Sequence, residues 1–315
     1  MNKKYDFVVD VLKTRLDKYL AEQLPSISRA HIQKDIEAGK VLVNGKSVIV
    51  TKHVVRVDDK VTYDYVEPKD PEPKNIPIHT IYNNHGLLII DKPPGIAVHP
   101  GSGFSGDSLT QGLLYHFKDV KVVGEDGRPG IVHRLDKDTS GVMLVALTQE
   151  MYDFLKDTFA ERKVKKEYIA LVRGRMEKPH GVIETPIGKS KHDFRKYTTE
   201  DMVEAKPSKT EYWVMEHLGA TGSYLDEYTL IRVQLHTGRT HQIRVHFSSL
   251  DHSLLGDPLY GTKKNGVKGL NRQFLHAASI ELQLPNGEWI KGESKLPEDL
   301  RTVLKKLGSK IVNKL

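Results

Sequence analysis

The sequence of 315 residues contains no cysteine. Disulfide bonds, thiolate-bound metal ions and cysteine nucleophiles are therefore excluded. The sequence also lacks any run of about 18 apolar residues, the length that a membrane-spanning helix needs. Its start, MNKKYD, lacks the apolar core of a signal peptide. From these absences we expect a cytoplasmic protein that does not span a membrane.

The composition is typical of a soluble, globular protein, with 38% hydrophobic and 28% charged residues. The length is sufficient for two domains, one of them with a large core. The formal net charge of +7 favours a polyanionic partner through long-range attraction. Since many basic proteins bind no nucleic acid, the charge alone does not identify that partner.

The first part of the chain has the pattern of a small domain. Apolar residues between 16 and 24 recur at helical spacing. Ser28 is expected to cap a second helix, which Gly39 ends. Residues 41–46 predict a strand that enters an Asn-Gly hairpin turn, and residues 61–65 predict another short strand.

A proline-rich segment follows this small domain. Residues 67–77 contain four prolines among charged residues. Proline cannot join the interior of a helix or a central strand, so the segment is expected to be a semi-rigid linker. We therefore predict a first domain at residues 1–67, a linker at 68–77 and a second domain at 78–315.

The second domain mixes strands and helices without a regular alternation. Ser108 and Gln111 have the spacing of a capping box for a helix. Thr148 and Thr240 are expected to cap two further helices, and apolar residues between 300 and 307 predict a last one. Apolar runs predict strands at residues 87–90, 142–147, 168–172, 210–218, 228–235 and 274–282. Many strands and few helices indicate an α+β fold rather than a doubly wound sheet.

The most informative segment is residues 130–141 (GIVHRLDKDTSG), which sets Asp136 between two cations just before an apolar run. A carboxylate beside an arginine stays ionised at neutral pH. On a loop against a buried strand, it suits a nucleophile or a stabiliser of positive charge. A structural ion pair is an equally simple interpretation. A glycosidase is a further alternative, but it needs a second carboxyl group at a set distance, and the sequence identifies none.

The first domain resembles the S4 RNA-binding domain. The matching segments are residues 14–20 (TRLDKYL), 28–29 (SR) and 36–45 (IEAGKVLVNG). The resemblance implies that cations on or beside the two short helices contact the phosphates of structured RNA; these cations are Arg15, Lys18, Arg29, His31 and Lys34. An ordinary solvated helix face is the alternative.

Residues 133–141 (HRLDKDTSG) resemble the active-site motif of the RluA/RluD family of RNA pseudouridine synthases. Four further segments match that family in the same order: residues 91–100 (DKPPGIAVHP), 166–172 (KEYIALV), 237–246 (TGRTHQIRVH) and 255–261 (LGDPLYG). Together with the first domain, these motifs span most of the chain. Residues 250–253 lack the Gly-His-Pro that often precedes the last motif, which leaves that loop in doubt but not the chemistry.

The resemblance implies an α+β fold with a mixed, largely antiparallel sheet, flanking helices and an active-site cleft. It implies that the protein isomerises uridine in structured RNA, for which we expect large-subunit ribosomal RNA, with transfer RNA as the alternative. The reaction needs no redox step or external group, so we expect no cofactor and no metal, and we expect a monomer. A non-catalytic RNA-binding protein with the same fold is less consistent with the intact Asp136, Tyr168 and Arg244.

The resemblance also implies the roles of individual residues. Asp136 would be the nucleophile, acting through either a ribose adduct or a glycal. Arg244 would pair with Asp136 and fix its rotamer. Arg134 would enter the RNA near the vacated base position and hold the target nucleotide flipped. Tyr168 would lie against the uracil face, and Ile243 would form a wall of the pocket.

Other polar residues have simpler interpretations. His133 beside the catalytic loop is expected to be a structural hydrogen-bonding residue rather than a general base. His236, His241 and His246 do not have the spacing of a zinc-binding motif. The basic segment 188–196 is either an RNA-contacting loop or a solvated one.

Overall fold

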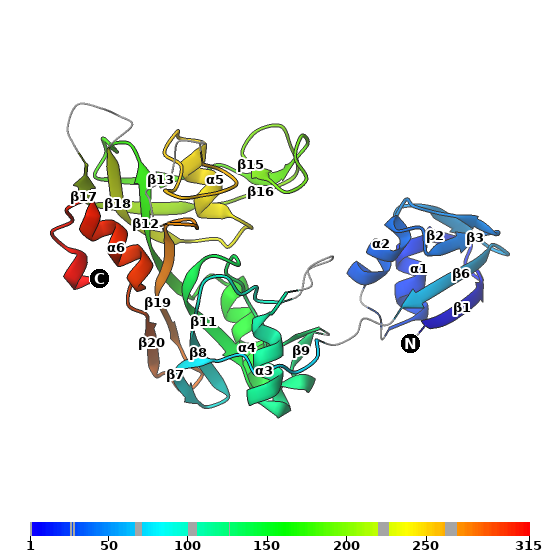
Figure 1. The fold of residues 1–315 in the computed structure, drawn as a ribbon. Helices are drawn as coiled ribbons and strands as arrows, with labels where there is room; N and C mark the ends of the chain where they lie inside the picture. Colours follow the sequence, from blue (N-terminus) through cyan, green and yellow to red (C-terminus); the bar gives the residue numbers. More distant parts are fainter. Residues whose placement is uncertain are drawn as a thin grey trace. The chain divides into compact units, whose positions relative to one another are not determined.

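The computed structural model describes residues 2–25, 27, 29–66, 71–99, 106–125, 127–219, 227–261 and 270–315. The chain divides into two compact units, Met1–Lys69 and Asp70–Leu315 (Figure 1). The predicted cap Ser28 and residues 67–70, at the start of the predicted linker, lie outside the described residues, while residues 71–78 form neither helix nor strand. Within the described ranges, no helix is long and apolar enough to cross a membrane.

The first unit is a four-stranded antiparallel sheet covered by two helices. The sheet has the order β1-β6-β3-β4, and two further strands, β2 and β5, pair with each other. The elements are β1 (Asn2–Val8), β2 (Lys13–Arg15), α1 (Leu16–Gln23), α2 (Arg29–Glu37), β3 (Val41–Val43), β4 (Lys46–Ser47), β5 (Val54–Arg56) and β6 (Lys60–Val66). The predicted helices and the hairpin at Asn44-Gly45 are present, whereas β1, β2 and β5 were not predicted.

The second unit is built on a nine-stranded sheet. Its order is β13-β17-β18-β12-β19-β11-β8-β7, and β20 pairs with β19. Every pair is antiparallel except β11 with β19. The strands are β7 (His79–Asn84), β8 (Leu87–Lys92), β11 (Ser140–Ala146), β12 (Lys165–Arg173), β13 (His180–Ile183), β17 (Thr210–Leu218), β18 (Tyr228–Leu235), β19 (Leu275–Gln283) and β20 (Trp289–Glu293). The predicted α+β fold is confirmed.

The helices and smaller elements surround this sheet. In the described part of this unit the helices are α3 (Leu109–His116), α4 (Gln149–Ala160), α5 (Gln242–Ser248) and α6 (Glu298–Lys306). Two short 3-10 helices are η1 (Lys118–Val122) and η2 (Val312–Lys314). The two small sheets consist of β9 (Gly124–Glu125) with β10 (Arg128–Pro129), and of β14 (Ile187–Ser190) with β15 (Tyr197–Thr198) and β16 (Met202–Lys206).

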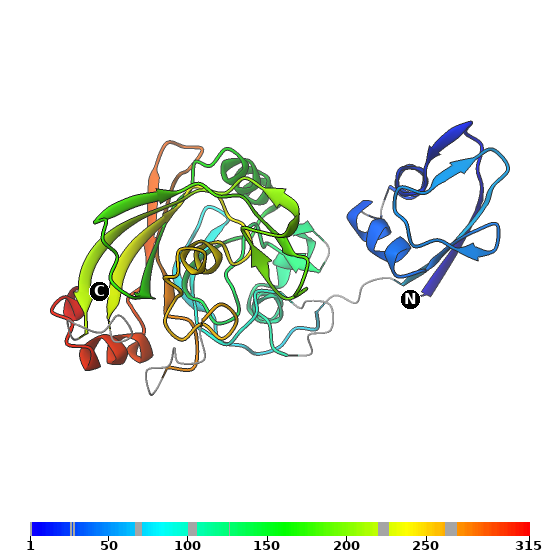
Figure 2. The same ribbon diagram turned by 90° about the horizontal axis from the view of Figure 1, so that it is seen from above.

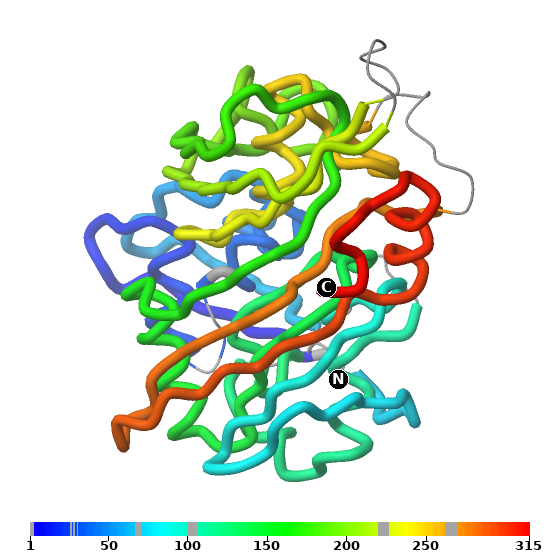
Figure 3. Tube along the Cα trace, turned by 90° about the vertical axis from the view of Figure 1, so that its left-hand side faces the viewer, coloured from blue at the N-terminus to red at the C-terminus, as the bar shows by residue number. Residues whose placement is uncertain are grey.

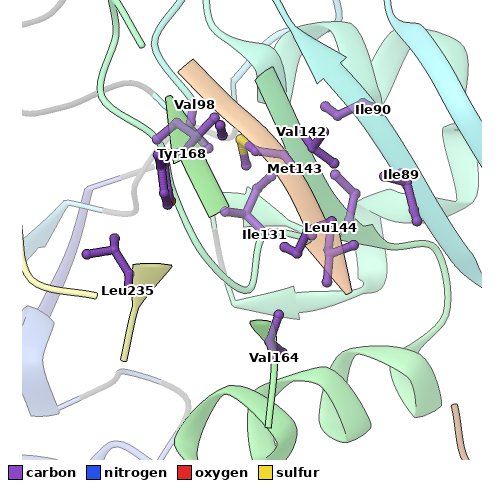
Figure 4. Close-up of a cluster of buried hydrophobic side chains, with 14 of the residues drawn as sticks. Ile89, Ile90, Val98, Ile131, Val142, Met143, Leu144, Val164, Tyr168 and Leu235 are labelled. Carbon is purple, nitrogen blue, oxygen red and sulfur yellow. The ribbon is translucent and has the colours of Figure 1, made fainter. Parts of the chain in front are cut away.

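Strand β12 separates two cores because its side chains alternate between the faces of the sheet. Tyr168 and the residues two and four positions later belong to the larger core, part of which is drawn in Figure 4. Ile169 and Leu171 point the other way and pack with Leu300 and Leu304 of α6. Figure 3 shows α6, in red, beside β19. Helix α6 therefore packs on the face of β12 opposite to Tyr168.

Helix α5 lies on the inner side of the curved sheet (Figure 2). The Gln242 side chain donates hydrogen bonds to Lys209 O at 3.0 Å and Thr210 Oγ1 at 2.9 Å, which tie the first turn of the helix to β17. The prediction that Thr240 caps this helix is wrong. The capping position is His241, which has a left-handed backbone. The Gln242 side chain instead accepts the Arg239 N–H at 2.9 Å and so organises the preceding turn.

Candidate active site

Four of the five predicted motifs, including residues 91–100 through His99, contribute to the lining of one cavity of about 600 Å³. Asp136 comes from the loop before β11, Tyr168 from β12, and Ile243 and Arg244 from α5. The sheet explains their proximity, because β19 lies between β11 and β12. Ala277 of β19 is the register partner of both Gly141 and Tyr168. The fold thus joins segments that are far apart in the sequence.

Asp136 is held by the arginine from α5. The Arg244 Nη1 group donates a hydrogen bond of 2.9 Å to Asp136 Oδ2. The remaining donors of the same guanidinium bind Asp257, with Nε to Oδ2 at 2.7 Å and Nη2 to Oδ1 at 2.9 Å. Arg244 is 6% exposed and Asp136 is 17% exposed at their side chains, so the carboxylate of Asp136 faces the cavity while its partner lies behind it.

The electrostatics keep this arginine charged. Burial alone would lower the pKa of Arg244, but the hydrogen bonds and charges of Asp257 and Asp136 outweigh burial and raise it. Burial likewise opposes ionisation of Asp257, and the hydrogen bonds and charge of Arg244 bring the pKa of that carboxyl below its usual value. The site therefore carries a buried cation between two carboxylates.

His241 lies on the other side of Asp136. Its Nε2 atom is 3.9 Å from Asp136 Oδ1, and its Nδ1 atom is 2.9 Å from the hydroxyl oxygen of Tyr260. Burial lowers the pKa of His241 and outweighs the opposing charge of Asp136, so the ring is neutral at pH 7. The backbone at His241 is left-handed, with φ of 56°.

Tyr168 lines the cavity and is 7% exposed. Figure 4 shows it at one side of the drawn cluster, as it does Leu235. Burial, together with the charge of Asp136, raises the pKa of Tyr168, so its hydroxyl stays protonated at neutral pH. A bulge in the pairing with β19 occurs between Glu167 and Tyr168, and such bulges change where a strand side chain points.

The loop that carries Asp136 is anchored on both sides by buried side chains. Lys92 Nζ donates to Lys137 O at 3.0 Å and to Pro93 O at 2.8 Å. Burial lowers the pKa of Lys92 to about 7. Arg272 Nη1 donates to Asp138 O at 3.1 Å, and Gln273 Nε2 donates to Thr139 Oγ1 at 3.1 Å. Asp136 therefore belongs to a preorganised loop.

Cations gather around the cavity. Arg134 is exposed and lines it, and it does not replace Arg244 as the partner that holds Asp136. Ile243 is 3% exposed and forms part of the wall. The other lining cations are Arg128, Lys156, Arg162, Lys166 and Arg239. Such a lining suits a polyanion.

His133 has the structural role that the sequence indicated. Its Nε2 atom accepts the Leu144 N–H at 2.9 Å, so this nitrogen carries no proton. The ring stacks on Phe159 with a centroid distance of 4.7 Å. Burial lowers the pKa of His133 to about 3. Neutral His133 thus links the start of the loop to β11.

In the first unit, the fully buried Asp17 organises two of the five predicted RNA-contacting cations. Its carboxylate accepts hydrogen bonds from Arg15 Nη2 at 2.9 Å and Arg29 Nη2 at 2.8 Å. Burial opposes its ionisation, but these arginines and Gln33 lower the pKa of Asp17 to about 2.

The other three cations are arranged differently. Lys18 and Lys34 are exposed on α1 and α2. His31 Nε2 lies 3.1 Å from Asp35 Oδ2. The first unit thus presents fixed arginines and exposed lysines together.

Sequence reasoning did not assign roles to Lys92, His241, Asp257, Tyr260 and Arg272. All but Arg272 lie inside motifs that were recognised, and this position indicated that they could belong to the site. Their partners could not be read from the sequence, because Arg244 is 13 positions from Asp257 and Arg272 is 134 positions from Asp138. Among the residues that the structure describes, no cluster of three or more His, Asp or Glu side chains could hold a metal ion.

Comparison with known proteins assigns the family. A family model described as RNA pseudouridylate synthase matches residues 86–249, and the S4 domain model matches residues 14–61. An uncharacterized RNA pseudouridine synthase of Aquifex aeolicus is 40% identical over 307 residues, covering 95% of each chain. Ribosomal large subunit pseudouridine synthase D of Yersinia pestis is 36% identical, covering 92% of this chain and 89% of that protein.

A solved structure leads to the same conclusion. Human RNA pseudouridylate synthase domain containing 1 superposes with a TM-score of 0.57 at 25% identity, covering 78% of this chain and 98% of that chain. The resemblance seen in the sequence is confirmed. The chain belongs to the RNA pseudouridine synthases with an S4 domain, and it is an isomerase that forms pseudouridine in RNA.

Proposed function

We propose that Asp136 is the nucleophile of this isomerase and that its substrate is uridine in large-subunit ribosomal RNA. The observation that carries the proposal is the hydrogen bond of 2.9 Å that Arg244 donates to Asp136. The carboxylate of Asp136 faces a cavity that is lined by many cations. The ribosomal substrate is supported by two relatives named ribosomal large subunit pseudouridine synthase D, from Yersinia pestis and Nitrosomonas europaea, at 36% and 38% identity.

The reaction breaks the bond between C1′ of the ribose and N1 of uracil and forms a bond between C1′ and C5. The proton on C5 leaves, and N1 gains a proton, so no external group is consumed. Breaking the first bond develops positive charge on the ribose, which a nearby carboxylate stabilises or captures. Both a ribose adduct and a glycal need Asp136 beside the sugar.

Arg244 prepares Asp136 for this step. A cation within hydrogen-bonding distance stabilises the ionised form of a carboxylate, and a guanidinium also fixes its orientation. The buried guanidinium of Arg244 is held in place, because Asp257 accepts two further hydrogen bonds from it. The carboxylate is therefore oriented before RNA arrives.

Tyr168 and Ile243 would hold the detached uracil. Both are almost fully buried and line the cavity that contains Asp136. An aromatic ring and an aliphatic wall suit a flat base that turns without leaving the site. The hydroxyl of Tyr168 would then take part in moving the C5 proton, giving up its own proton as it accepts that of C5.

Arg134 would hold the RNA with its target nucleotide flipped out. It is exposed beside the cavity, and an arginine can both stack on bases and pair with phosphates. Flipping costs a few kcal/mol and costs least where the base is already unstacked. The cations of the first unit, Arg15, Lys18, Arg29, His31 and Lys34, would add phosphate contacts.

We also propose that the protein acts as a monomer in the cytoplasm, because one chain supplies every group assigned to the site. In this proposal residues 1–67 form the RNA-binding domain, residues 68–77 the linker and residues 78–315 the catalytic domain. The S4 match at residues 14–61 and the compact unit Asp70–Leu315 support this division.

Replacing the nucleophile tests the proposal. We expect Asp136→Ala to abolish pseudouridine formation while its thermal unfolding and RNA affinity stay close to those of the unchanged protein. The measurement is tritium release from C5-labelled uridine in ribosomal RNA fragments. Turnover near the wild-type rate would exclude the nucleophile assignment and would favour a different catalytic group.

The substrate needs a separate experiment. We expect pseudouridine mapping of RNA from cells lacking this protein to show lost positions in large-subunit ribosomal RNA. Losses confined to transfer RNA would support the alternative substrate. An unchanged map together with RNA binding would support a non-catalytic RNA-binding protein.

A further inference from the structure

We propose that Asp257 and Tyr260 are positioning residues for the isomerisation, Asp257 acting through Arg244 and Tyr260 acting through His241. Together they would fix the two groups that flank the Asp136 carboxylate and leave Oδ1 as the reacting oxygen. The inference rests on the proposed role of Asp136. It adds a function for the turn at residues 257–260, which contributes no side chain to the lining of the cavity.

Asp257 is built to orient the guanidinium of Arg244. Two hydrogen bonds, of 2.7 and 2.9 Å, occupy Nε and Nη2, so the remaining Nη1 group points at Asp136 Oδ2. The two parallel bonds determine the plane of the guanidinium as well as its place. The bidentate pair therefore directs the remaining donor, Nη1, toward Asp136.

Asp257 is itself rigidly held. Its Oδ1 atom also accepts the N–H groups of Leu259 at 2.9 Å and Tyr260 at 3.0 Å. The preceding Gly256 has φ of +73°, and a Cβ at that position would collide with the carbonyl oxygen of Arg272. Asp257 is 4% exposed and belongs to a turn whose backbone has little conformational freedom.

Tyr260 fixes the opposite flank. Its hydroxyl oxygen accepts the Tyr197 N–H at 2.9 Å and lies 2.9 Å from His241 Nδ1. In this proposal the hydroxyl donates its hydrogen to Nδ1, and the imidazole proton is then on Nε2. That N–H faces Asp136 Oδ1 at 3.9 Å. The Tyr260 ring also lies 5.1 Å from the guanidinium of Arg244, so one side chain touches both flanking groups.

The two oxygens of Asp136 are consequently different. Oδ2 is engaged by a charged donor at 2.9 Å, which withdraws electron density from it. Oδ1 lies beyond hydrogen-bonding distance of His241 and keeps its lone pairs for the ribose. The Arg244 hydrogen bond on Oδ2 and the His241 ring beside Oδ1 together limit rotation of the carboxylate, and this limits which oxygen meets C1′.

A purely structural role for the turn explains less. Arg272 and Asp299 form a similar two-bond pair, at 2.7 and 3.0 Å, beside the same loop. That pair ends on the backbone of the loop, at Asp138 O, whereas the pair of Asp257 with Arg244 ends on the reacting carboxylate. Arg272, like Lys92, thus anchors the backbone of the loop, whereas Arg244 anchors its nucleophile.

The test is a pair of double-mutant cycles measured by single-turnover pseudouridine formation and by RNA affinity. Asp257→Asn keeps the size of the side chain but presents an amide to Arg244. We expect the single-turnover rate to fall about 100-fold, as for a misplaced reacting group, with little change in RNA Kd. In the Arg244→Met background, Asp257→Asn should cause no further loss, because its route to Asp136 is already gone.

Tyr260→Phe, combined with His241→Gln, forms the second cycle. Tyr260→Phe keeps the aromatic ring against Arg244 and removes only the hydroxyl group. We expect a smaller loss of about 10-fold, which disappears in the His241→Gln background. It also keeps the inference testable if Asp257→Asn does not fold, since thermal unfolding of every variant is measured alongside.

Glu216→Gln is the matched control. The Glu216 carboxylate accepts hydrogen bonds from Ser309 Oγ and Lys310 N and so binds β17 to the C-terminal segment, and Glu216 does not line the cavity. We expect it to change thermal unfolding but not the single-turnover rate. Losses that simply add in both cycles, or unchanged rates for Asp257→Asn and Tyr260→Phe, would overturn the inference. Activity of Asp136→Ala would instead overturn the proposed function, so the two failures are distinguishable.

Discussion

At the scale of single residues, the partner of Asp136 is an arginine 108 positions away rather than its near neighbour Arg134. The two arginines occupy different environments. Arg244 is buried behind the carboxylate, whereas Arg134 is exposed beside the cavity. A buried arginine that touches the nucleophile should affect the chemical step, and an exposed one should affect contact with RNA.

This difference predicts that the same substitution affects turnover at one position and RNA binding at the other. We expect Arg244→Met to lower the turnover of bound RNA by about 100-fold or more, with a smaller effect on RNA Kd. Arg134→Met should weaken productive RNA binding more than Arg244→Met does. Single-turnover rates and filter-binding titrations of both variants measure the two quantities. Wild-type turnover by Arg244→Met would remove the proposed function of the ion pair.

His133 gives a prediction about pH. Its pKa in the folded protein is about 3, below the ordinary value of about 6.5. Between these values the unfolded chain binds a proton that the folded protein does not, so stability falls as the pH drops below about 6.5. Allowing for the partial exposure of the ring, the loss at pH 5 should be about 1–2 kcal/mol.

The matched variant is His133→Gln, whose amide oxygen can still accept the Leu144 N–H but does not titrate. Urea unfolding at pH 7.5 and pH 5 measures both proteins. We expect the variant to lose less stability than the unchanged protein over this interval. Equal losses would show that His133 does not contribute to the acid sensitivity.

At the scale of secondary-structure elements, the site depends on the parallel contact between β11 and β19. Gly141 stands at this contact, with φ of +115° and Ala277 opposite it. A Cβ there would collide with the Ala277 carbonyl oxygen. The strand that follows the Asp136 loop can approach β19 only because residue 141 is glycine.

Gly141→Ala should therefore destabilise the second unit by about 3 kcal/mol or more, since steric overlap adds to backbone strain. Gly287→Ala is the control, because Gly287 also has a positive φ, of +86°, but no atom lies within 4 Å of its added Cβ. Its cost should be about 1 kcal/mol. Denaturant unfolding followed by far-ultraviolet circular dichroism measures both, and equal costs would contradict the steric argument.

At the scale of the whole molecule, the two units have separate hydrophobic cores. The buried residues of the first unit, such as Leu16 and Ile36, form one cluster, and those of the second unit form two others. Each unit therefore has the means to fold by itself. This separation allows the contribution of the first unit to RNA binding to be measured by removing it.

Deletion of residues 1–67 should weaken RNA binding and make it less sensitive to salt, because fewer phosphate contacts release fewer counterions. Lys18→Gln and Lys34→Gln should each reduce the salt slope by about one contact. Lys291→Gln, in β20 and paired with Glu293, is the control and should leave the slope unchanged. An unchanged slope after the deletion would count against RNA binding by the first unit.

Local features of the sequence were sufficient for most elements of the fold. The capping residue Thr148 accepts the Met151 N–H at 3.3 Å, and Gln111 accepts the Ser108 N–H at 2.9 Å, as their spacing predicted. The Asn44-Gly45 turn and the apolar run of β11 were equally legible. Caps, tight turns and buried strands depend on neighbouring residues, so their signals lie within a few positions.

The elements that were missed or misplaced show where local sequence signals are insufficient. The short strands β2 and β5 have three residues each and are stabilised by pairing with each other, not by their own pattern. Thr240 resembled a helix cap, but the contacts of Gln242 with β17 and with Arg239 N place the helix start one residue later. Tertiary contacts outweigh local propensity in both cases.

The sequence by itself determined the family, the α+β class and the identity of the loop that carries Asp136. Only the tertiary structure decided how that carboxylate is held: Arg244 behind it, Asp257 behind Arg244, and His241 with Tyr260 on the other side. The physical reason is that these contacts are non-local. They exist because β19 pairs with β11 on one side and with β12 on the other, and because α5 is tied to β17. Neither arrangement leaves a periodic trace in the chain.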